Sequence, residues 1–194
     1  MSGATLTLTV ARVWPVAEAV AAFELRDPHG GVLPPFTAGA HVDVHLEGGL
    51  VRQYSLVNDE TERDRYVIAV QRLEGGRGGS VALHREAREG RSLAVAAPRN
   101  TFPLEAGDAP VLLLAGGIGI TPLLAMARAL DRRGQPFALH YSAADRGRAA
   151  FADELLAGPF RGAVQLYETR APSPRRLDLH RLAREAPAGT RVYA

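Results

Sequence analysis

Residues 111–124 decide the fold, and they read Val111-Leu112-Leu113-Leu114-Ala115-Gly116-Gly117-Ile118-Gly119-Ile120-Thr121-Pro122-Leu123-Leu124. The apolar run at 111–115 predicts a central strand that is covered on both faces. Because glycine has no Cβ, Gly116, Gly117 and Gly119 allow a tight turn in which the backbone can approach a ligand closely.

A helix is expected directly after this turn. Thr121 is suited to the N-cap, and Pro122 to the first helical position, where no backbone N–H is needed. Apolar residues continue at helical spacing to Leu130, and Gly134 marks the end. A helix N-terminus beyond the carboxyl end of a strand binds phosphate, and Gly-x-Gly-x-x-Pro is a variant of the dinucleotide fingerprint. The stretch therefore predicts either a nucleotide site or a glycine turn that serves packing alone.

Composition limits the possible functions. The chain has 194 residues, 46% of them hydrophobic, and a formal net charge of +2, with its basic residues scattered along the sequence. This predicts a globular protein without a nucleic-acid-binding stripe. No apolar run approaches the roughly 18 residues of a membrane span, and the N-terminus lacks the layout of a signal peptide, so we expect no membrane partner and a cytoplasmic location. The absence of cysteine excludes disulfides and a thiolate-ligated cluster on this chain.

Residues 1–104 are predicted to form a β-rich domain. Runs with strand character lie between glycine-containing turns, at residues 6–10, 20–25, 41–46, 50–56 and 66–73. Many short strands of this kind indicate a small antiparallel barrel. The run at 20–25 also contains Ala and Glu, which favour helix, but the turn at 27–31 that follows it favours a strand.

One face of the predicted strand at 41–46 carries His41, Asp43 and His45. These residue types can ligate a metal, but no third histidine lies nearby. A solvated polar face opposite buried Val42 and Val44 is the preferred interpretation, and no metal site is predicted.

The next predicted strand contains Arg52, Gln53, Tyr54 and Ser55. Strand periodicity places Arg52 and Tyr54 on one face and Gln53 and Ser55 on the other. An arginine, an aromatic ring and a hydroxyl so close together can clamp a phosphate, stack on a flat ring and hydrogen-bond its edge. An ordinary edge strand with cross-strand pairs explains the tetrapeptide equally well.

A second glycine-rich stretch, at residues 75–80, opens a short amphipathic segment at 81–88. Gly78, Gly79 and Ser80 can offer successive N–H groups and a hydroxyl to an anion, and Arg77 adds positive charge. A plain flexible loop is the alternative. Two anion cradles in one chain suggest two phosphate-bearing ligands, or one ligand for each domain.

Residues 105–194 alternate strand and helix, as in a parallel α/β sheet. After the opening unit we expect strands at 137–141, 164–167 and 190–193 and helices at 148–156 and 178–185. Ser142 and Asp145 lie where the carboxyl end of the second strand meets the ligand crevice of such sheets. Asp145 is suited either to hydrogen-bond a ribose diol, where it would repel a 2′-phosphate, or simply to start the following helix.

Five motifs occur together in one order: Arg52-Gln53-Tyr54-Ser55-Leu56, Gly78-Gly79-Ser80, Pro98-Arg99-Asn100-x-Phe102-Pro103-Leu104, Gly116-Gly117-Ile118-Gly119-Ile120-Thr121-Pro122 and Ala150-Phe151-x-Asp153-Glu154-Leu155. With these motifs the chain resembles the phthalate dioxygenase reductase and vanillate demethylase reductase group of the ferredoxin-reductase superfamily, over essentially its whole length. The resemblance implies a six-stranded antiparallel flavin-binding barrel at 1–104 and a Rossmann-like nicotinamide-binding domain at 105–194. It implies FMN, rather than FAD, as the flavin and NADH as the electron donor.

The resemblance also implies roles for individual residues. Arg52 would contact the flavin phosphate, Tyr54 would pack on the isoalloxazine ring, and Ser55 would hydrogen-bond near its N5 atom. The phosphate would be held by Gly78, Gly79 and Ser80. Thr121 would lie between flavin and nicotinamide, and the NADH pyrophosphate and ribose would be bordered by Gly116, Gly117 and Gly119.

In function, the resemblance implies an oxidoreductase that passes electrons from NADH through FMN to an iron–sulfur centre or an oxygenase acting on aromatic acids. Family members normally continue with Cys-Gly-Pro, a further helix and an iron–sulfur domain, whereas this sequence ends at Ala194. We therefore expect an α/β domain that is incomplete at its C-terminus, no iron–sulfur cluster on this chain, and weakened hydride transfer with FMN binding retained. The alternatives are a free-standing flavin reductase and a catalytically incompetent flavin-binding module.

Overall fold

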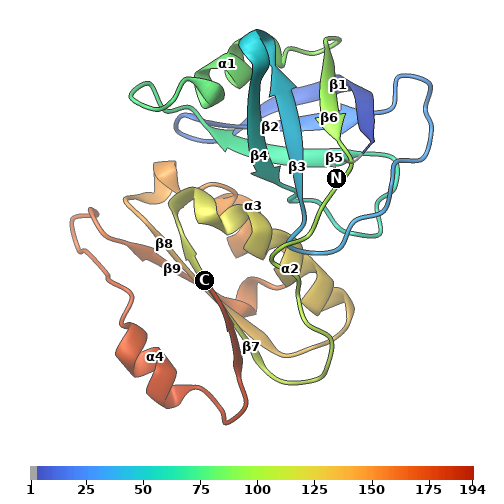
Figure 1. Ribbon diagram of the computed structural model, residues 1–194. Coiled ribbons are helices and arrows are strands. Elements are labelled where there is room, and N and C mark those ends of the chain that lie inside the picture. Colours follow the sequence, from blue (N-terminus) through green and yellow to red (C-terminus); the bar gives the residue numbers. More distant parts are fainter. Residues whose placement is uncertain (1–3) are drawn as a thin grey trace.

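Six antiparallel strands build the first part of the molecule in the computed structural model, which describes residues 4–194 (Figure 1). Along the sheet they follow the order β4-β3-β6-β1-β2-β5. Their bounds are Thr5–Ala17 for β1, Val20–Arg26 for β2, His41–Leu46 for β3, Leu50–Ser55 for β4, Tyr66–Gln71 for β5 and Ser92–Ala96 for β6. The start of the predicted first domain, residues 1–3, lies outside the described residues.

The sheet closes on itself just beyond the end of β4. Leu56, just beyond β4, bridges Ile68 of β5, and the Val57 N–H donates to the Val67 carbonyl at 2.9 Å. Helix α1 (Gly79–Glu86) contributes Leu83 to the barrel interior. The predicted antiparallel barrel is confirmed, with a seam between β4 and β5 that narrows toward Leu56.

Strand β3 shows how alternation builds this barrel. Val42 and Val44 are fully buried, while Asp43 points outward and forms an ion pair with Arg99, and His45 is exposed. Within the part of the chain that the structure describes, no group of three or more His, Cys, Asp or Glu side chains is arranged to hold a metal ion.

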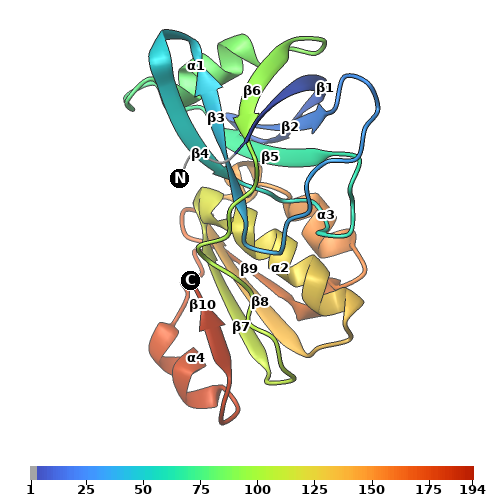
Figure 2. The ribbon, with the colours of Figure 1, turned by 45° about the vertical axis from the view of Figure 1, so that its right-hand side comes forward.

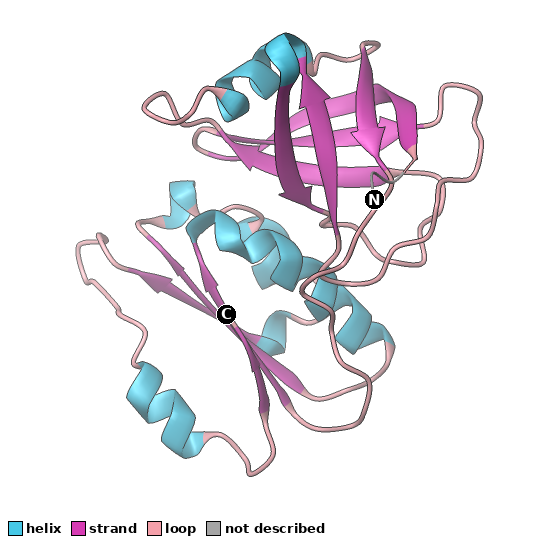
Figure 3. Ribbon diagram, viewed as in Figure 1, coloured by secondary structure: helices cyan, strands magenta, loops and turns pink. Residues whose placement is uncertain are grey.

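The second part is a parallel sheet with helices on its faces (Figure 3), and its four strands follow the order β10-β7-β8-β9. Helices α2 and α3 lie on the face toward the barrel, and α4 lies on the opposite face (Figure 2). The bounds are Val111–Gly116 for β7, Ile120–Arg132 for α2, Phe137–Ala143 for β8, Ala152–Ala157 for α3, Val164–Glu168 for β9, Leu179–Glu185 for α4 and Arg191–Tyr193 for β10. The predicted alternation of strand and helix is confirmed.

Three local predictions are wrong. A 3-10 turn at Gly117–Gly119 precedes α2, so Gly119 occupies the N-cap and Thr121 lies inside the first turn, where its Oγ1 donates to the Ile118 carbonyl at 3.0 Å. Pro122 is therefore the third helical residue and not the first. The helix expected at 148–156 is the shorter α3, which begins at Ala152. The helix cannot extend back through Phe151, because this residue has a left-handed φ of +60° and its N–H donates to Val16 of the barrel.

Helix α2 joins the two parts. Its buried face, including Ile120 and Leu124, belongs to one hydrophobic cluster that continues onto Val20 of β2 and onto Val67 and Ala69 of β5, all on the outside of the barrel. Farther along α2, Arg128 donates to the Val57 carbonyl and also pairs with Glu154 of α3. Packing and hydrogen bonds together fix the sheet relative to the barrel.

No helix within residues 4–194 combines the length and the apolar character that crossing a bilayer requires.

Glu60, in the barrel loop beneath α2, carries a network of charged hydrogen bonds. Its carboxylate accepts from the Ala38 N–H at 2.8 Å, from Arg132 at 2.6 Å and from Arg133 at 2.9 Å. Burial opposes ionisation of Glu60, but these three donors outweigh burial and hold the pKa of the carboxyl below its usual value. A depressed pKa in the folded state adds stability above the unfolded-state pKa, and this stability is lost as pH falls through the folded-state pKa.

We therefore predict that Glu60→Gln lowers the free energy of unfolding by about 1–2 kcal/mol at pH 7, since charged hydrogen bonds are lost while both guanidiniums stay partly exposed. The loss should shrink as the pH falls toward the acidic range in which wild-type Glu60 is protonated. Urea unfolding at several pH values measures this. Glu74→Gln, which removes an exposed ion pair with Arg72, is the matched control. An equal effect of both substitutions at pH 7 would contradict the role of Glu60.

Candidate functional site

A cavity of about 480 Å³ lies between the barrel and the start of α2. We call it the barrel cavity. It follows the seam between β4 and β5, so side chains from both faces of β4 reach it. Its walls are formed by Arg52, Gln53, Tyr54, Ser55, Ala69, Val70, Gln71, Leu73, Gly76, Arg77, Gly79, Ser80, Ile118, Gly119, Thr121 and Pro122.

Strand register explains how β4 presents its residues. Tyr54 pairs with Val42 and Arg52 with Val44, so both point toward the barrel side, while Gln53 and Ser55 pair with outward-facing residues of β3. Tyr54 packs against the barrel core, and burial raises the pKa of its hydroxyl although the Arg52 charge partly opposes this. Tyr54 therefore offers a neutral aromatic surface to the cavity.

Arg52 lies directly against the first turn of α1. Its Nη2 donates to the Arg77 carbonyl at 2.8 Å, and its Nη1 donates to the Val51 carbonyl at 2.9 Å. A Cβ on Gly79 would come within 2.6 Å of Arg52 Cγ, so only glycine leaves room for the arginine. A guanidinium and a helix N-terminus thus meet at one point of the cavity wall, an arrangement that attracts an anion.

The residues before and after Gly79 complete this corner. Gly78 occupies the N-cap of α1 with a left-handed φ of +75° and supplies no side chain to the helix. Ser80 Oγ accepts from the Leu73 N–H at 3.1 Å, which fixes the hydroxyl and leaves its proton available to a ligand. The first N–H groups of α1 are therefore available for an anion.

A second cavity, of about 400 Å³, lies at the carboxyl ends of β7, β8 and β9. We call it the strand-end cavity. Ile118 and Gln71 line both cavities, so the two spaces adjoin at these side chains. The other residues that line it are Val20, Gly117, Ser142, Ala143, Ala144, Arg148, Ala150, Thr169 and Arg170.

Most of the predicted site residues lie on these two cavities. The barrel cavity is lined by Arg52, Gln53, Tyr54, Ser55, Arg77, Gly79, Ser80, Gly119 and Thr121, and the strand-end cavity by Gly117 and Ser142. Gly78, Gly116 and Asp145 line neither. Asp145 caps the 3-10 turn Arg146–Arg148, where its Oδ1 accepts from the Arg148 N–H at 3.1 Å. This matches the helix-starting interpretation of Asp145, while its proposed contact with a ribose stays a prediction.

Several lining residues belong to no motif in the sequence. Gln71 reaches both cavities because β5 closes against β4, a long-range pairing that no local pattern reveals. Thr169 and Arg170 follow β9 directly. Ligands of parallel α/β sheets bind at the carboxyl ends of the strands, and this rule could have identified both residues. Arg148 was hidden because a helix was expected at its position.

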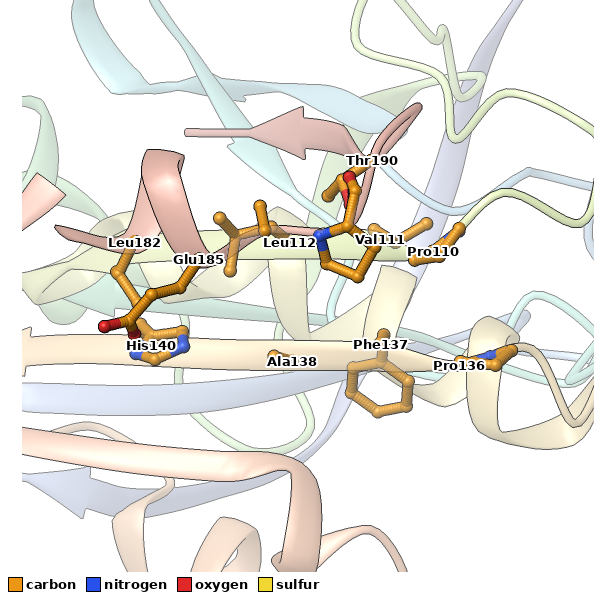
Figure 4. A pocket seen from close by; sticks show the side chains of 12 residues that line it. Pro110, Val111, Leu112, Pro136, Phe137, Ala138, His140, Leu182, Glu185 and Thr190 are labelled. Carbon is orange, nitrogen blue, oxygen red and sulfur yellow. The ribbon is translucent and has the colours of Figure 1, made fainter. Parts of the chain in front are cut away.

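The sheet also bears an apolar groove on the face away from the barrel (Figure 4). It runs between α4, which contributes Leu182 and Glu185, and strands β7 and β8, which contribute Leu112 and His140. None of the predicted site residues lines it.

No family model matches the chain. Individual proteins do match it closely. The chain is 44% identical over 188 residues to the tert-butanol monooxygenase / tert-amyl alcohol desaturase reductase subunit of Aquincola tertiaricarbonis, covering 97% of this chain and 56% of that protein. It is 44% identical over 178 residues to the vanillate O-demethylase oxidoreductase of Pseudomonas sp. (strain HR199 / DSM 7063), covering 92% of this chain and 56% of that protein.

A solved structure matches as well. The structure of phthalate dioxygenase reductase, described as modular for electron transfer from pyridine nucleotides to [2Fe–2S], superposes with a TM-score of 0.92 at 40% identity. The match covers 97% of this chain and 59% of that one. This chain thus spans less than three-fifths of the length of these relatives, and the predicted resemblance and fold class are confirmed.

The contact between Arg52 and Gly79 leads to a structural prediction. Gly79→Ala should push the Arg52 side chain off the first turn of α1 and break its hydrogen bond to the Arg77 carbonyl, because the new methyl group needs the same space. A crystal structure of the variant measures this displacement. Gly75→Ala is the matched control, since a Cβ there meets open space. An unmoved Arg52 in the Gly79→Ala variant would contradict the close packing described above.

Proposed function

Because the chain is homologous, over nearly its whole length, to the phthalate dioxygenase reductase and vanillate demethylase reductase group, we propose that it is the flavin- and nicotinamide-binding part of an NADH-dependent reductase. It takes electrons from NADH through FMN and passes them to an iron–sulfur protein or to an oxygenase or demethylase of aromatic acids. The proposed flavin domain is residues 1–104, and the proposed nicotinamide domain is residues 105–194. The proposed location of the protein is the cytoplasm.

One observation carries the proposal: a ring-sized cavity with an anion corner adjoins a second cavity at the strand ends of a parallel sheet. The residues present fit a flavin mononucleotide. Tyr54 offers a flat apolar surface, Arg52 and the first turn of α1 offer a phosphate site, and the polar Ser55 lies on the same wall. A bound flavin supplies hydride acceptance and single-electron release, chemistry that no side chain possesses.

The chain itself binds and orients the flavin and the nicotinamide nucleotide, and it excludes water from the space between them. Arg52 holds the phosphate by charge-assisted hydrogen bonds, and Gly78, Gly79 and Ser80 add N–H and hydroxyl donors around it, with Arg77 beside them. The choice of FMN over FAD rests on the glycine-serine cradle at this corner and on the resemblance to the reductase group. Gln53 and Tyr54 line the wall along the ring, and Ser55 donates its hydroxyl proton toward the ring edge.

The glycine turn after β7 and the carboxyl end of β8 form one wall of the proposed nicotinamide nucleotide site. Gly116, Gly117 and Gly119 let the backbone approach the pyrophosphate and ribose, while Ser142 and Asp145 follow the carboxyl end of the neighbouring strand. Thr121 lines the barrel cavity one helical step from this turn, next to Ile118, and so stands where the two rings are to meet. Holding two reactants in contact in a dry space is enough to accelerate hydride transfer.

The proposal predicts that the purified protein is yellow and binds FMN roughly one to one. Anaerobic addition of NADH should bleach the absorbance of the bound flavin, which stopped-flow spectroscopy follows. A colourless protein that FMN does not reconstitute would refute the proposal. A yellow protein that dithionite reduces and NADH does not would indicate a flavin-binding module without a working nicotinamide site, and rapid turnover of free FMN would indicate a free-standing flavin reductase.

The position of Ser55 gives a prediction about its role. Ser55→Ala should slow reduction of bound flavin by NADH by about tenfold, the order of one hydrogen bond of 1.4 kcal/mol, while FMN affinity changes less. Single-turnover reduction and FMN titration measure the two quantities. Ser92→Ala, in the exposed part of β6, is the control. Unchanged reduction kinetics in Ser55→Ala would remove Ser55 from the catalytic site.

A further inference from the structure

The strand-end cavity carries two guanidinium groups, from Arg148 and Arg170. No aspartate or glutamate is among the residues that line it, as far as residues 4–194 define its wall. A guanidinium group can donate two parallel hydrogen bonds to the oxygens of one phosphate. The two guanidinium groups on this wall therefore suit the phosphate part of a nucleotide.

Arg148 is held from one side. Its Nε donates to Oε2 of Glu18 at 3.1 Å, and the Asp145 carboxylate lies 3.8 Å from the same nitrogen. Its Nη1 and Nη2 have no hydrogen-bond partner within the described residues. The outer edge of the guanidinium is thus free to bind two oxygens of a ligand.

Glu18 belongs to the barrel, in the turn between β1 and β2. Two backbone hydrogen bonds fix this turn on the α/β part: the Glu18 N–H donates to the Gly147 carbonyl at 2.7 Å, and the Phe151 N–H donates to the Val16 carbonyl at 3.2 Å. The contact between the two parts therefore does not depend on the Glu18 side chain.

The ion pair itself is exposed, with 63% of the Glu18 side chain and 48% of the Arg148 side chain accessible to solvent. Exposed pairs contribute little to stability. The main consequence of this pair is that it restricts the direction in which the Arg148 guanidinium points.

We propose that Glu18 is a positioning residue of the barrel that aims Arg148 at a phosphate group of the nicotinamide nucleotide in the strand-end cavity. The inference rests on the proposed function, because it takes that nucleotide as the ligand. The phosphate belongs either to the pyrophosphate, which every such nucleotide carries, or to the 2′-position of NADPH. An anchored arginine loses less rotational freedom on binding than a free one, so the anchor raises affinity.

Calorimetric titration of the whole chain with ADP-ribose and with 2′-phospho-ADP-ribose tests the proposal without any redox reaction. Arg148→Gln should weaken binding by about tenfold, the effect of one charge-assisted contact. Arg146→Gln is the matched control, because it removes an equal charge two residues away in an ion pair with Asp153 outside the cavity.

Glu18→Ala should weaken binding by about threefold, because the Arg148 side chain then loses its rotational freedom only when the ligand binds. Glu18→Gln keeps an acceptor for the Arg148 Nε and removes the same charge as Glu18→Ala, so it should bind as the wild type if the anchoring hydrogen bond is what matters. In the Arg148→Gln background, Glu18→Ala should cause no further loss. A role of Glu18 in folding alone would not produce this rescue by glutamine together with the loss of effect in the double variant.

Losses with both probes assign the phosphate to the pyrophosphate. A loss confined to 2′-phospho-ADP-ribose assigns it to the 2′-position and would replace NADH by NADPH in the proposed function. Unchanged affinities in Arg148→Gln, or an additive loss in the double variant, would overturn the inference while the wild type still binds. A wild-type chain that binds neither probe would overturn the nicotinamide side of the proposed function as well.

Discussion

The packing of Arg52 on Gly79 is the contact on which the proposed flavin site depends. A strand of the barrel and the first turn of α1 meet there so closely that a Cβ at position 79 would collide with the Arg52 side chain in its present position. The contact brings a guanidinium and the free N–H groups of a helix together, which defines where a phosphate can bind. A ligand fixed at this corner extends along Tyr54 toward Ser55 and Thr121, so one polar contact determines the direction of the whole molecule.

The proposed function also requires that the two cavities stay adjacent. Helix α2 keeps them adjacent by packing its apolar face on the outside of β2 and β5, and Glu60 binds the arginines at the C-terminal end of α2. As a result Ile118 and Gln71 line both cavities, one side chain coming from each part of the molecule. The turn at Glu18 adds a contact at the far side of the strand-end cavity. Transfer between two bound rings needs this fixed geometry more than it needs an acid or base.

Much of this arrangement was accessible from the sequence. The apolar run at 111–115 and the alternation at 41–46 report burial directly. The motif from Arg52 to Ser55, together with Gly79 and Ser80, marks the barrel cavity because its chemistry is local. The errors have different origins. The helix expected at 148–156 is shortened by a long-range hydrogen bond from Phe151 to Val16, whereas Thr121 loses its capping role to a local 3-10 turn that the preceding glycines permit. Gln71 reaches the cavities because β5 closes against β4, and Arg148 is oriented by its contact with the barrel turn at Glu18. No local sequence pattern encodes either contact.

The central claim is that Arg52 and α1 hold the phosphate of a flavin mononucleotide, and it is tested most directly by comparing FMN with riboflavin, which lacks the phosphate. Fluorescence titration of the flavin-free protein should give an affinity for FMN about a hundredfold higher than for riboflavin, corresponding to roughly 2.7 kcal/mol of phosphate binding. Arg52→Gln should remove at least a tenfold part of this difference while leaving riboflavin affinity unchanged. Equal affinities for the two flavins, or a preference for FMN that persists in Arg52→Gln, would contradict the account.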